Sequence, residues 1–272
     1  MRNARPLSVR PRWPGAGLPR SPEPGPPEAP HSYPPRRPPA AASSAFETVV
    51  DPTVPVTSQN GAIFVVLGLG VARCSGTSVS APNLSVVFTA GHCVHDGRHW
   101  LGHKWVFVPG YHHGERPFGV FTAKWLGTTP QWLGHGNENF DIGAAVVGRN
   151  ERGQRLAAAV GAAGIAWGLS PQQDFDIYGY PVAPPFDGST LQHCAQTPYE
   201  GHDLASFLAP GPLNLAVECN VTGGASGGGW FNADGLLNSV TTYGYPEDPA
   251  TDFGPYFGRA AGHLFKQAAA IR

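Results

Sequence analysis

Charged residues are scarce in this chain of 272 residues, since Lys, Arg, Asp and Glu together make up only 14% of it. A helical bundle needs many such residues on its outer faces, so this composition, with 36 Gly and 29 Pro, favours a loop-rich β protein. The chain also has no excess of basic residues. Its net charge is −1, and the part beyond residue 40 contains 11 basic and 17 acidic residues. This balance argues against a nucleic-acid-binding surface. No run of 18 apolar residues occurs, so we predict no transmembrane helix and no membrane partner.

Cysteine is also rare, with four residues and no C-x-x-C pair. They fall as two sets, Cys74 with Cys93 and Cys194 with Cys219, separated by about a hundred residues. Two interpretations remain open, namely two disulfides in an oxidising compartment or four free buried thiols in the cytosol. Without a C-x-x-C or an H-E-x-x-H motif we predict no metal site.

The first 45 residues differ in composition from the rest of the chain. Thirteen Pro fall within residues 1–40, with Arg and Gly between them and almost no aliphatic run. Such a segment buries too little apolar surface to offset its loss of entropy, so we expect it to be disordered or polyproline-like. It lacks the apolar middle of a signal peptide. A pro-segment removed on maturation, a misassigned start codon and a genuine disordered arm all remain open.

From residue 61 onward, short apolar runs alternate with turn residues, which is typical of antiparallel β-barrels. We therefore predict an all-β protein with two six-stranded antiparallel barrels, over residues 46–155 and 156–272. The first barrel would use residues 62–67, 71–79, 85–90, 104–108, 119–126 and 142–147, and the second 165–167, 175–180, 191–195, 213–217, 228–231 and 236–243. A C-terminal helix over residues 260–269 follows from their helix-forming composition.

Three short motifs carry candidate chemistry, in the order His, Asp, Ser. His92 ends a run of strand formers in the sequence VFTAGHC, Asp141 opens an apolar strand in NFDIGAAVV, and Ser226 lies within GGASGGG. Each motif alone has an ordinary structural interpretation, as a core histidine, a strand cap and a turn serine. Their joint occurrence indicates an acyl-transfer enzyme with a serine nucleophile. His92 and Asp141 belong to one predicted barrel and Ser226 to the other, so the site would lie in the cleft between them.

The chemistry explains why these residue types are needed together. Serine is a weak nucleophile at neutral pH and requires a base within hydrogen-bond reach, which His92 can supply. A buried carboxylate, here Asp141, would hold the imidazole tautomer and stabilise the imidazolium. In a tight glycine-rich turn the backbone N–H groups of Gly224 and Ser226 can converge to form an oxyanion hole.

The sequences TAGHC, DIG and GASGG at these three positions resemble the signatures of the chymotrypsin-like (trypsin-like) serine peptidases. The closer similarity is to the bacterial branch that includes the glutamyl endopeptidases, and it spans about residues 58–270. The resemblance implies a double β-barrel, secretion, and endopeptidase activity on polypeptide substrates through an acyl-enzyme. It also implies disulfides Cys74–Cys93 and Cys194–Cys219, no cofactor and a monomer.

Several positions depart from the family pattern. Ala225 stands where trypsin-like members have the Asp that pairs with a new N-terminus, and Gly229 stands where Pro is usual. Asn220 replaces the Asp that selects basic side chains, and we place Thr242 where glutamyl endopeptidases have a His. We therefore predict a small, polar, uncharged specificity pocket formed by Asn220, Thr222, Thr242 and Tyr243. These departures leave open the alternative of a catalytically silent relative that acts as a binding or cell-wall-associated module.

Overall fold

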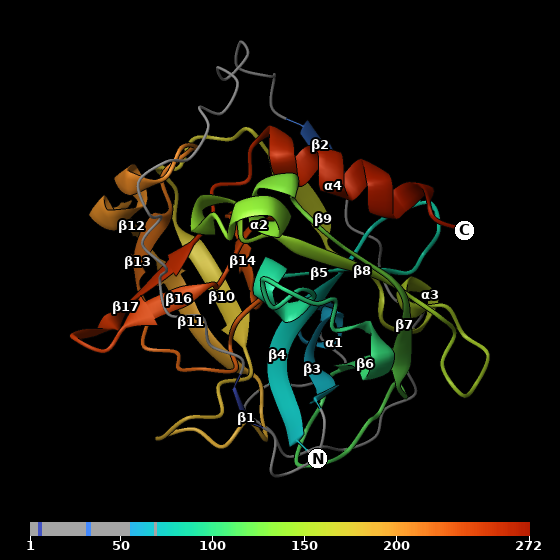
Figure 1. Cartoon of the computed structure of the whole chain (residues 1–272). Coiled ribbons are helices and arrows are strands. Elements are labelled where there is room, and N and C mark those ends of the chain that lie inside the picture. Colours follow the sequence, from blue (N-terminus) through green and yellow to red (C-terminus); the bar gives the residue numbers. More distant parts are fainter. Residues whose placement is uncertain (1–4, 7–30, 34–54, 68–69) are drawn as a thin grey trace.

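The computed structural model describes residues 5–6, 31–33, 55–67 and 70–272. Most of the segment predicted as a disordered arm therefore lies outside the described residues, apart from the short strands β1 (Arg5–Pro6) and β2 (His31–Tyr33). The remainder is mainly β structure, and Figure 1 shows the first half (blue to green) beside the second half (yellow to red). Within the described ranges, no helix combines the length and apolar character needed to cross a membrane.

The first half forms a closed barrel of six antiparallel strands, as predicted. Its strands pair in the order β4-β3-β6-β7-β8-β5, and a β4–β5 ladder closes the ring. Alternate apolar residues fill the interior, including the fully buried Ile63, Phe107 and Phe121. The bounds are β3 (Asn60–Leu67), β4 (Gly70–Val79), β5 (Val86–Thr89), β6 (Trp105–Pro109), β7 (Phe121–Thr128) and β8 (Gly143–Val147).

The second half is built from two hydrogen-bonded sheets, which are joined where β11 runs on into β12 and where β15 runs on into β16. Together they close into the second six-stranded barrel that we predicted. One sheet has the order β11-β10-β14-β15-β9-β2, with a parallel β15–β9 ladder, and the other has the order β12-β13-β17-β16. The strands are β9 (Gly164–Trp167), β10 (Phe175–Gly179), β11 (Gln192–Thr197), β12 (Tyr199–His202), β13 (Leu215–Glu218), β14 (Gly229–Phe231), β15 (Leu236–Val240), β16 (Tyr243–Tyr245) and β17 (Asp248–Gly254).

The chain passes from the first sheet to the second between β15 and β16. The segment expected as one strand over residues 236–243 ends as β15 and restarts as β16. Between them the Thr241 N–H donates to Gly228 O (2.9 Å), whereas the Thr242 N–H donates to Phe253 O (2.9 Å). The chain thus exchanges partners from the first sheet to the second at this point. Strands β12 and β17 were not predicted, because their sequences are polar and β17 contains a proline.

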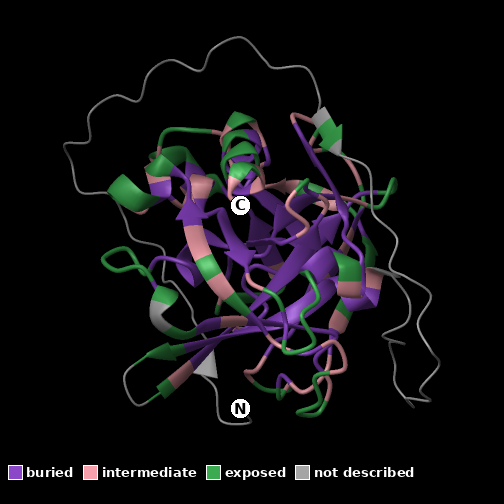
Figure 2. Ribbon diagram, turned by 90° about the vertical axis from the view of Figure 1, so that its right-hand side faces the viewer, coloured by how far each residue is buried: buried purple, intermediate pink, exposed green. Residues whose placement is uncertain are grey.

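The C-terminal helix α4 (Arg259–Ala270) confirms the helix predicted over residues 260–269. It packs across both halves, and Phe88 of β5, Ile165 of β9 and Phe265 of α4 belong to one buried cluster. Figure 2 shows this continuous buried interior beneath an exposed rim. The two halves therefore share a core, which holds their facing loops in a fixed relation.

Short helices occupy several connections between strands. The α-helices are α1 (Pro55–Gln59), α2 (Pro130–His135) and α3 (Leu156–Val160). The 3₁₀ turns are η1 (Gly91–Cys93), η2 (Gly102–Lys104), η3 (Glu138–Phe140) and η4 (Leu204–Leu208). His92 of the predicted triad lies in η1, and Asp141 follows directly after η3.

Candidate active site

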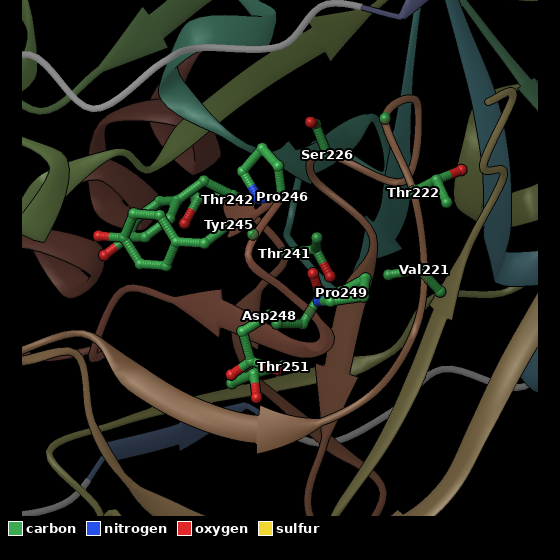
Figure 3. Close-up of a pocket in the computed structure, with 14 residues that line it drawn as sticks. Val221, Thr222, Ser226, Thr241, Thr242, Tyr245, Pro246, Asp248, Pro249 and Thr251 are labelled. Atoms are coloured by element: carbon green, nitrogen blue, oxygen red, sulfur yellow. The ribbon is translucent and has the colours of Figure 1, made fainter.

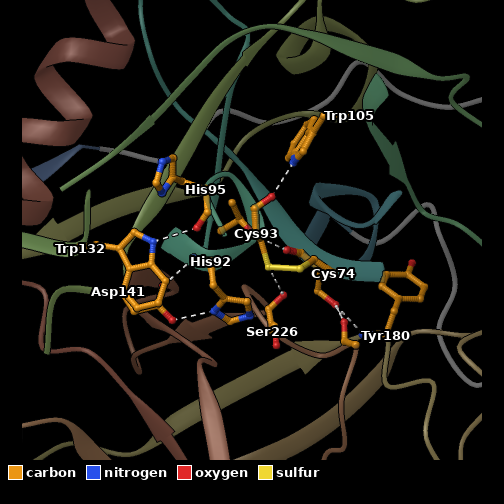
Figure 4. Close-up of a disulfide and its surroundings, with 12 residues drawn as sticks. Cys74, His92, Cys93, His95, Trp105, Trp132, Asp141, Tyr180 and Ser226 are labelled. Carbon is orange, nitrogen blue, oxygen red and sulfur yellow. Dashed lines mark hydrogen bonds and ion pairs between the residues drawn. A yellow bond between two sulfur atoms is a disulfide. The ribbon is translucent and has the colours of Figure 1, made fainter. Parts of the chain in front are cut away.

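His92 lies in η1, directly after the buried strand β5, and its side chain is only 1% exposed. Two tryptophans fix the backbone of this turn, because Trp105 Nε1 donates to Cys93 O and Trp132 Nε1 donates to His95 O, each at 3.0 Å (Figure 4). The Cys74–Cys93 disulfide attaches the same turn to β4. The imidazole is therefore held by a rigid backbone rather than by a mobile loop.

Asp141 follows η3 and precedes β8, and it is 2% exposed. Its Oδ2 lies 2.7 Å from His92 Nδ1, and its Oδ1 accepts the backbone N–H of His92 at 2.7 Å. A carboxylate only accepts hydrogen bonds, so Nδ1 carries the proton of this pair and Nε2 is the nitrogen left for chemistry. Gly91 makes the approach possible, since a Cβ there would lie 2.7 Å from Asp141 Oδ1.

Ser226 lies in the loop between β13 and β14, and Figure 4 places it beside the imidazole of His92. His92 Nε2 is buried and has no hydrogen-bond partner among the described residues. The Ser75 N–H donates to Ser226 O at 2.8 Å, which fixes the serine backbone against β4. The structure thus brings together His92, Asp141 and Ser226 from three separate segments, without a hydrogen bond between Ser226 and Nε2.

The glycines around Ser226 are required by the shape of its loop. Gly224 and Gly227 have φ values of +103° and +81°, which favour glycine. A side chain on Gly227 would also collide with Thr89 Oγ1 and would lie 2.5 Å from Ser75 O. The loop can therefore lie against the first barrel only with glycine at this position.

Peptide geometry indicates where the backbone donors of this loop point. Gly223 O accepts the Val182 N–H at 2.8 Å, and Ala225 O accepts the Gly228 N–H at 2.7 Å. In a trans peptide the N–H points opposite to the C=O of the same unit. The N–H groups of Gly224 and Ser226 therefore point away from those two bonds, as donors to an oxyanion would.

Ser75 is a residue of the site that we did not predict. Its buried Oγ donates to Gly224 O at 2.9 Å and accepts the Tyr180 N–H at 2.8 Å. It therefore fastens the Ser226 loop to both halves of the molecule. No local signal in the sequence marks this role, because β4 also carries the buried polar residues Thr77 and Ser78.

A cavity of about 230 Å³ opens beside Ser226 (Figure 3). Thr222, Thr242 and Tyr243, which we expect in the specificity pocket, are among the residues that line it. Asn220, the fourth residue of the predicted specificity pocket, is exposed and is not among the residues that line this cavity. In contrast to the uncharged pocket that we predict from the sequence, this cavity has the carboxyl groups of Asp248 and Asp252 in its lining.

Hydrogen bonds hold the pocket wall in place. Tyr243 OH and Tyr245 OH both donate to Asp203 Oδ2, at 2.6 and 2.8 Å, and Asn214 Nδ2 donates to Tyr243 OH at 2.9 Å. Burial raises the pKa of the Tyr243 hydroxyl, so this phenol stays neutral and acts as a donor. Burial also raises the pKa of the Asp252 carboxyl well above its ordinary value.

Both implied disulfides are present, Cys74–Cys93 and Cys194–Cys219. Among the described residues, one cluster of His and Cys atoms is compact enough to hold a metal, formed by His92, Cys74 and Cys93. Its two sulfur atoms are bonded to each other and offer no thiolate, so this cluster does not fit a metal.

Comparison with solved structures shows close relatives of the whole described fold. The protease Anisep from Arthrobacter nicotinovorans is 36% identical, with a TM-score of 0.72 over 80% of this chain and 98% of its own. The thermostable serine protease AL20 from an extremophilic microorganism is 34% identical, with a TM-score of 0.71 over 79% and 99%. A Glu endopeptidase shares the fold at 17% identity and a TM-score of 0.61, over 82% and 95%. No protein-family model and no curated protein sequence matches the chain.

Proposed function

Because this chain belongs to the chymotrypsin-like serine proteases, we propose that it is a secreted endopeptidase that cleaves peptide bonds through an acyl-enzyme on Ser226. The observation that carries this proposal is the buried His92–Asp141 pair. Its 2.7 Å hydrogen bond leaves His92 Nε2 without a described partner and beside Ser226. A nucleophile, a base and a group that orients the base are thus in one place.

In the proposed reaction, Ser226 Oγ attacks the carbonyl carbon of the scissile peptide while His92 Nε2 takes the hydroxyl proton. Asp141 stabilises the imidazolium that results. Collapse of the tetrahedral intermediate breaks the C–N bond, and His92 gives its proton to the leaving amine. Water, activated by the same imidazole, then hydrolyses the ester and restores the free serine.

The N–H groups of Gly224 and Ser226 are proposed to bind the negative oxygen of each tetrahedral intermediate. Support comes from the peptide geometry described above and from Ser75, which holds Gly224 O. Preorganised donors of this kind are worth about 100–1,000-fold in rate each. Ala225 is buried in the fold, so this loop is held by uncharged contacts where trypsin-like members use an ion pair.

Secretion is proposed on the strength of the disulfides. The described residues contain no free cysteine, and both pairs are bonded. Disulfides form and persist in oxidising compartments, whereas cytosolic thiols stay reduced.

Active-site labelling of the full chain tests the proposed function. A fluorophosphonate probe should label the wild type and fail to label Ser226→Ala or His92→Ala. Ser78→Ala, at a buried serine of β4 away from the site, is the matched control and should label normally. Casein hydrolysis measured on the same samples should follow the labelling. Folded protein that neither labels nor hydrolyses casein would support the silent binding module instead.

A further inference from the structure

A carboxylate is buried in the cavity next to the nucleophile. Asp252 is 3% exposed and lines the same cavity as Ser226. Its Oδ2 has no hydrogen-bond partner among the described residues. A buried carboxylate without a partner lowers the stability of a fold, so its presence in a substrate pocket calls for a ligand group that pairs with it.

The strand pairing explains why this carboxylate is open to the cavity. Asp252 lies on β17, between β13 and β16, directly opposite Val217 and Gly244. Residues opposite each other in neighbouring strands share one face of the sheet. Asp252 is thus flanked by an apolar side chain on one side and by none on the other. A Cβ on Gly244 would lie 3.5 Å from Asp252 Oδ1, in the space that glycine leaves empty.

The charge of the cavity is of one sign. Asp248 and Asp252 are among its lining residues, and within the part of the chain that the structure describes no Lys, Arg or His lines it. Val221, Pro246 and Pro249 supply apolar wall. The volume of about 230 Å³ exceeds the roughly 150 Å³ of an engineered cavity that accepts benzene. One long side chain with an apolar stem and a cationic head fits these features.

We propose that Asp252 determines substrate specificity by pairing with an Arg or Lys side chain of the residue whose carbonyl Ser226 attacks. This inference rests on the proposed peptidase function. The cavity is lined by Ser226 itself, so a side chain filling it belongs to the residue at the reacting carbonyl. An acidic substrate side chain would add a third carboxylate with no cation to offset it, and an apolar one would leave Asp252 unpaired. Asp252 lies on β17, whereas Asn220, at the position where trypsin-like members have the selective Asp, lies in the loop after β13.

Peptide amides that differ only in the residue before the cleaved bond test this inference. With Arg, Lys, Gln, Met, Glu and Ala compared, kcat/KM for Arg and Lys should exceed that for Gln by about 100-fold. Asp252→Asn should reduce the Arg and Lys values by roughly 30- to 1,000-fold and leave Gln nearly unchanged. Asp234→Asn, at an exposed carboxylate in the turn between β14 and β15 and outside the cavity lining, is the matched control and should leave kcat/KM within about twofold of the wild type.

Labelling of Ser226 by the fluorophosphonate should be unchanged in Asp252→Asn, which shows that the reacting groups are intact. A measurement on the wild type alone gives a second test. Butylguanidinium should inhibit hydrolysis at least 10-fold more strongly than butylurea, its uncharged counterpart.

The outcomes separate this inference from the proposed function. Labelling and casein hydrolysis with no preference for Arg or Lys, or with a preference for Glu, would overturn the role of Asp252 and leave the peptidase standing. An Arg preference that survives in Asp252→Asn would overturn it as well. Failure to label and to cleave any substrate would instead overturn the function itself.

Discussion

Ser75→Ala removes the hydroxyl group that holds the Ser226 loop in place and changes no group that contacts substrate. Ser75 Oγ donates to Gly224 O at 2.9 Å and accepts the Tyr180 N–H at 2.8 Å, and the residue is buried. The substitution keeps the Ser75 N–H bond to Ser226 O, because that bond uses the backbone. The change therefore tests whether the side chain positions the loop that carries Gly224 and Ser226.

The expected magnitude follows from the two groups that lose their partner. Each buried, unsatisfied backbone group costs about 1–3 kcal/mol, so the free energy of unfolding should fall by about 2–6 kcal/mol. For a protein of this size that corresponds to a decrease in Tm on the order of 10 °C. Loss of an oxyanion donor outright costs about 100–1,000-fold in kcat, so a loop that is loosened but intact should lose about 10-fold.

Ser78→Ala is the matched control on the same strand. Ser78 is buried, and its Oγ donates to Gly161 O at 2.9 Å, away from the Ser226 loop. It should lower the free energy of unfolding by about 1–3 kcal/mol and leave kcat unchanged. Thermal unfolding and steady-state hydrolysis of one peptide amide, measured for both variants, give the comparison. Equal losses of Tm with kcat of Ser75→Ala within about twofold of wild type would refute a positioning role.

Three further predictions concern other parts of the site. Asp141→Asn should lower kcat by about 10⁴, because an amide can donate to His92 Nδ1 and hold the wrong tautomer; a fall below about 10-fold in steady-state hydrolysis would contradict the proposed role. Replacing Cys74 and Cys93 by Ser should lower Tm by about 6–12 °C, since a loop of this length is worth about 3 kcal/mol, and calorimetry of the double variant tests this. Burial raises the pKa of the Asp252 carboxyl above its unfolded value, so the stability it contributes is present below the unfolded pKa of about 3.9 and is lost as pH rises through the folded pKa. Asp252→Asn should therefore match the wild type near pH 4 and exceed its Tm at pH 7, and an Asn variant less stable at pH 7 would contradict this.

Much of the fold could be predicted because strand formation in this chain follows local alternation. All six strands of the first barrel lie within two or three residues of the predicted runs, and their apolar residues face one interior. The second half was less predictable. Strand β17 contains Pro249 and acidic residues, so it has little intrinsic strand preference, and it exists because β13 and β16 supply hydrogen-bond partners on both sides.

The sequence by itself determined which side chains could take part in acyl transfer, because His92, Asp141 and Ser226 each lie in a short motif whose turn and glycine requirements are local. The charge of the neighbouring cavity was decided only by tertiary structure. Asp252 is opposite Gly244 through a ladder between two strands, and no local pattern shows which residue a strand will place across from another. The same holds for Ser75, whose partners Gly224 and Tyr180 lie 149 and 105 residues away along the chain. Turn and strand preferences depend on steric contacts between neighbouring residues, so they can be predicted from the local sequence. The burial of a side chain and its partner across the cleft depend on how distant segments pack together.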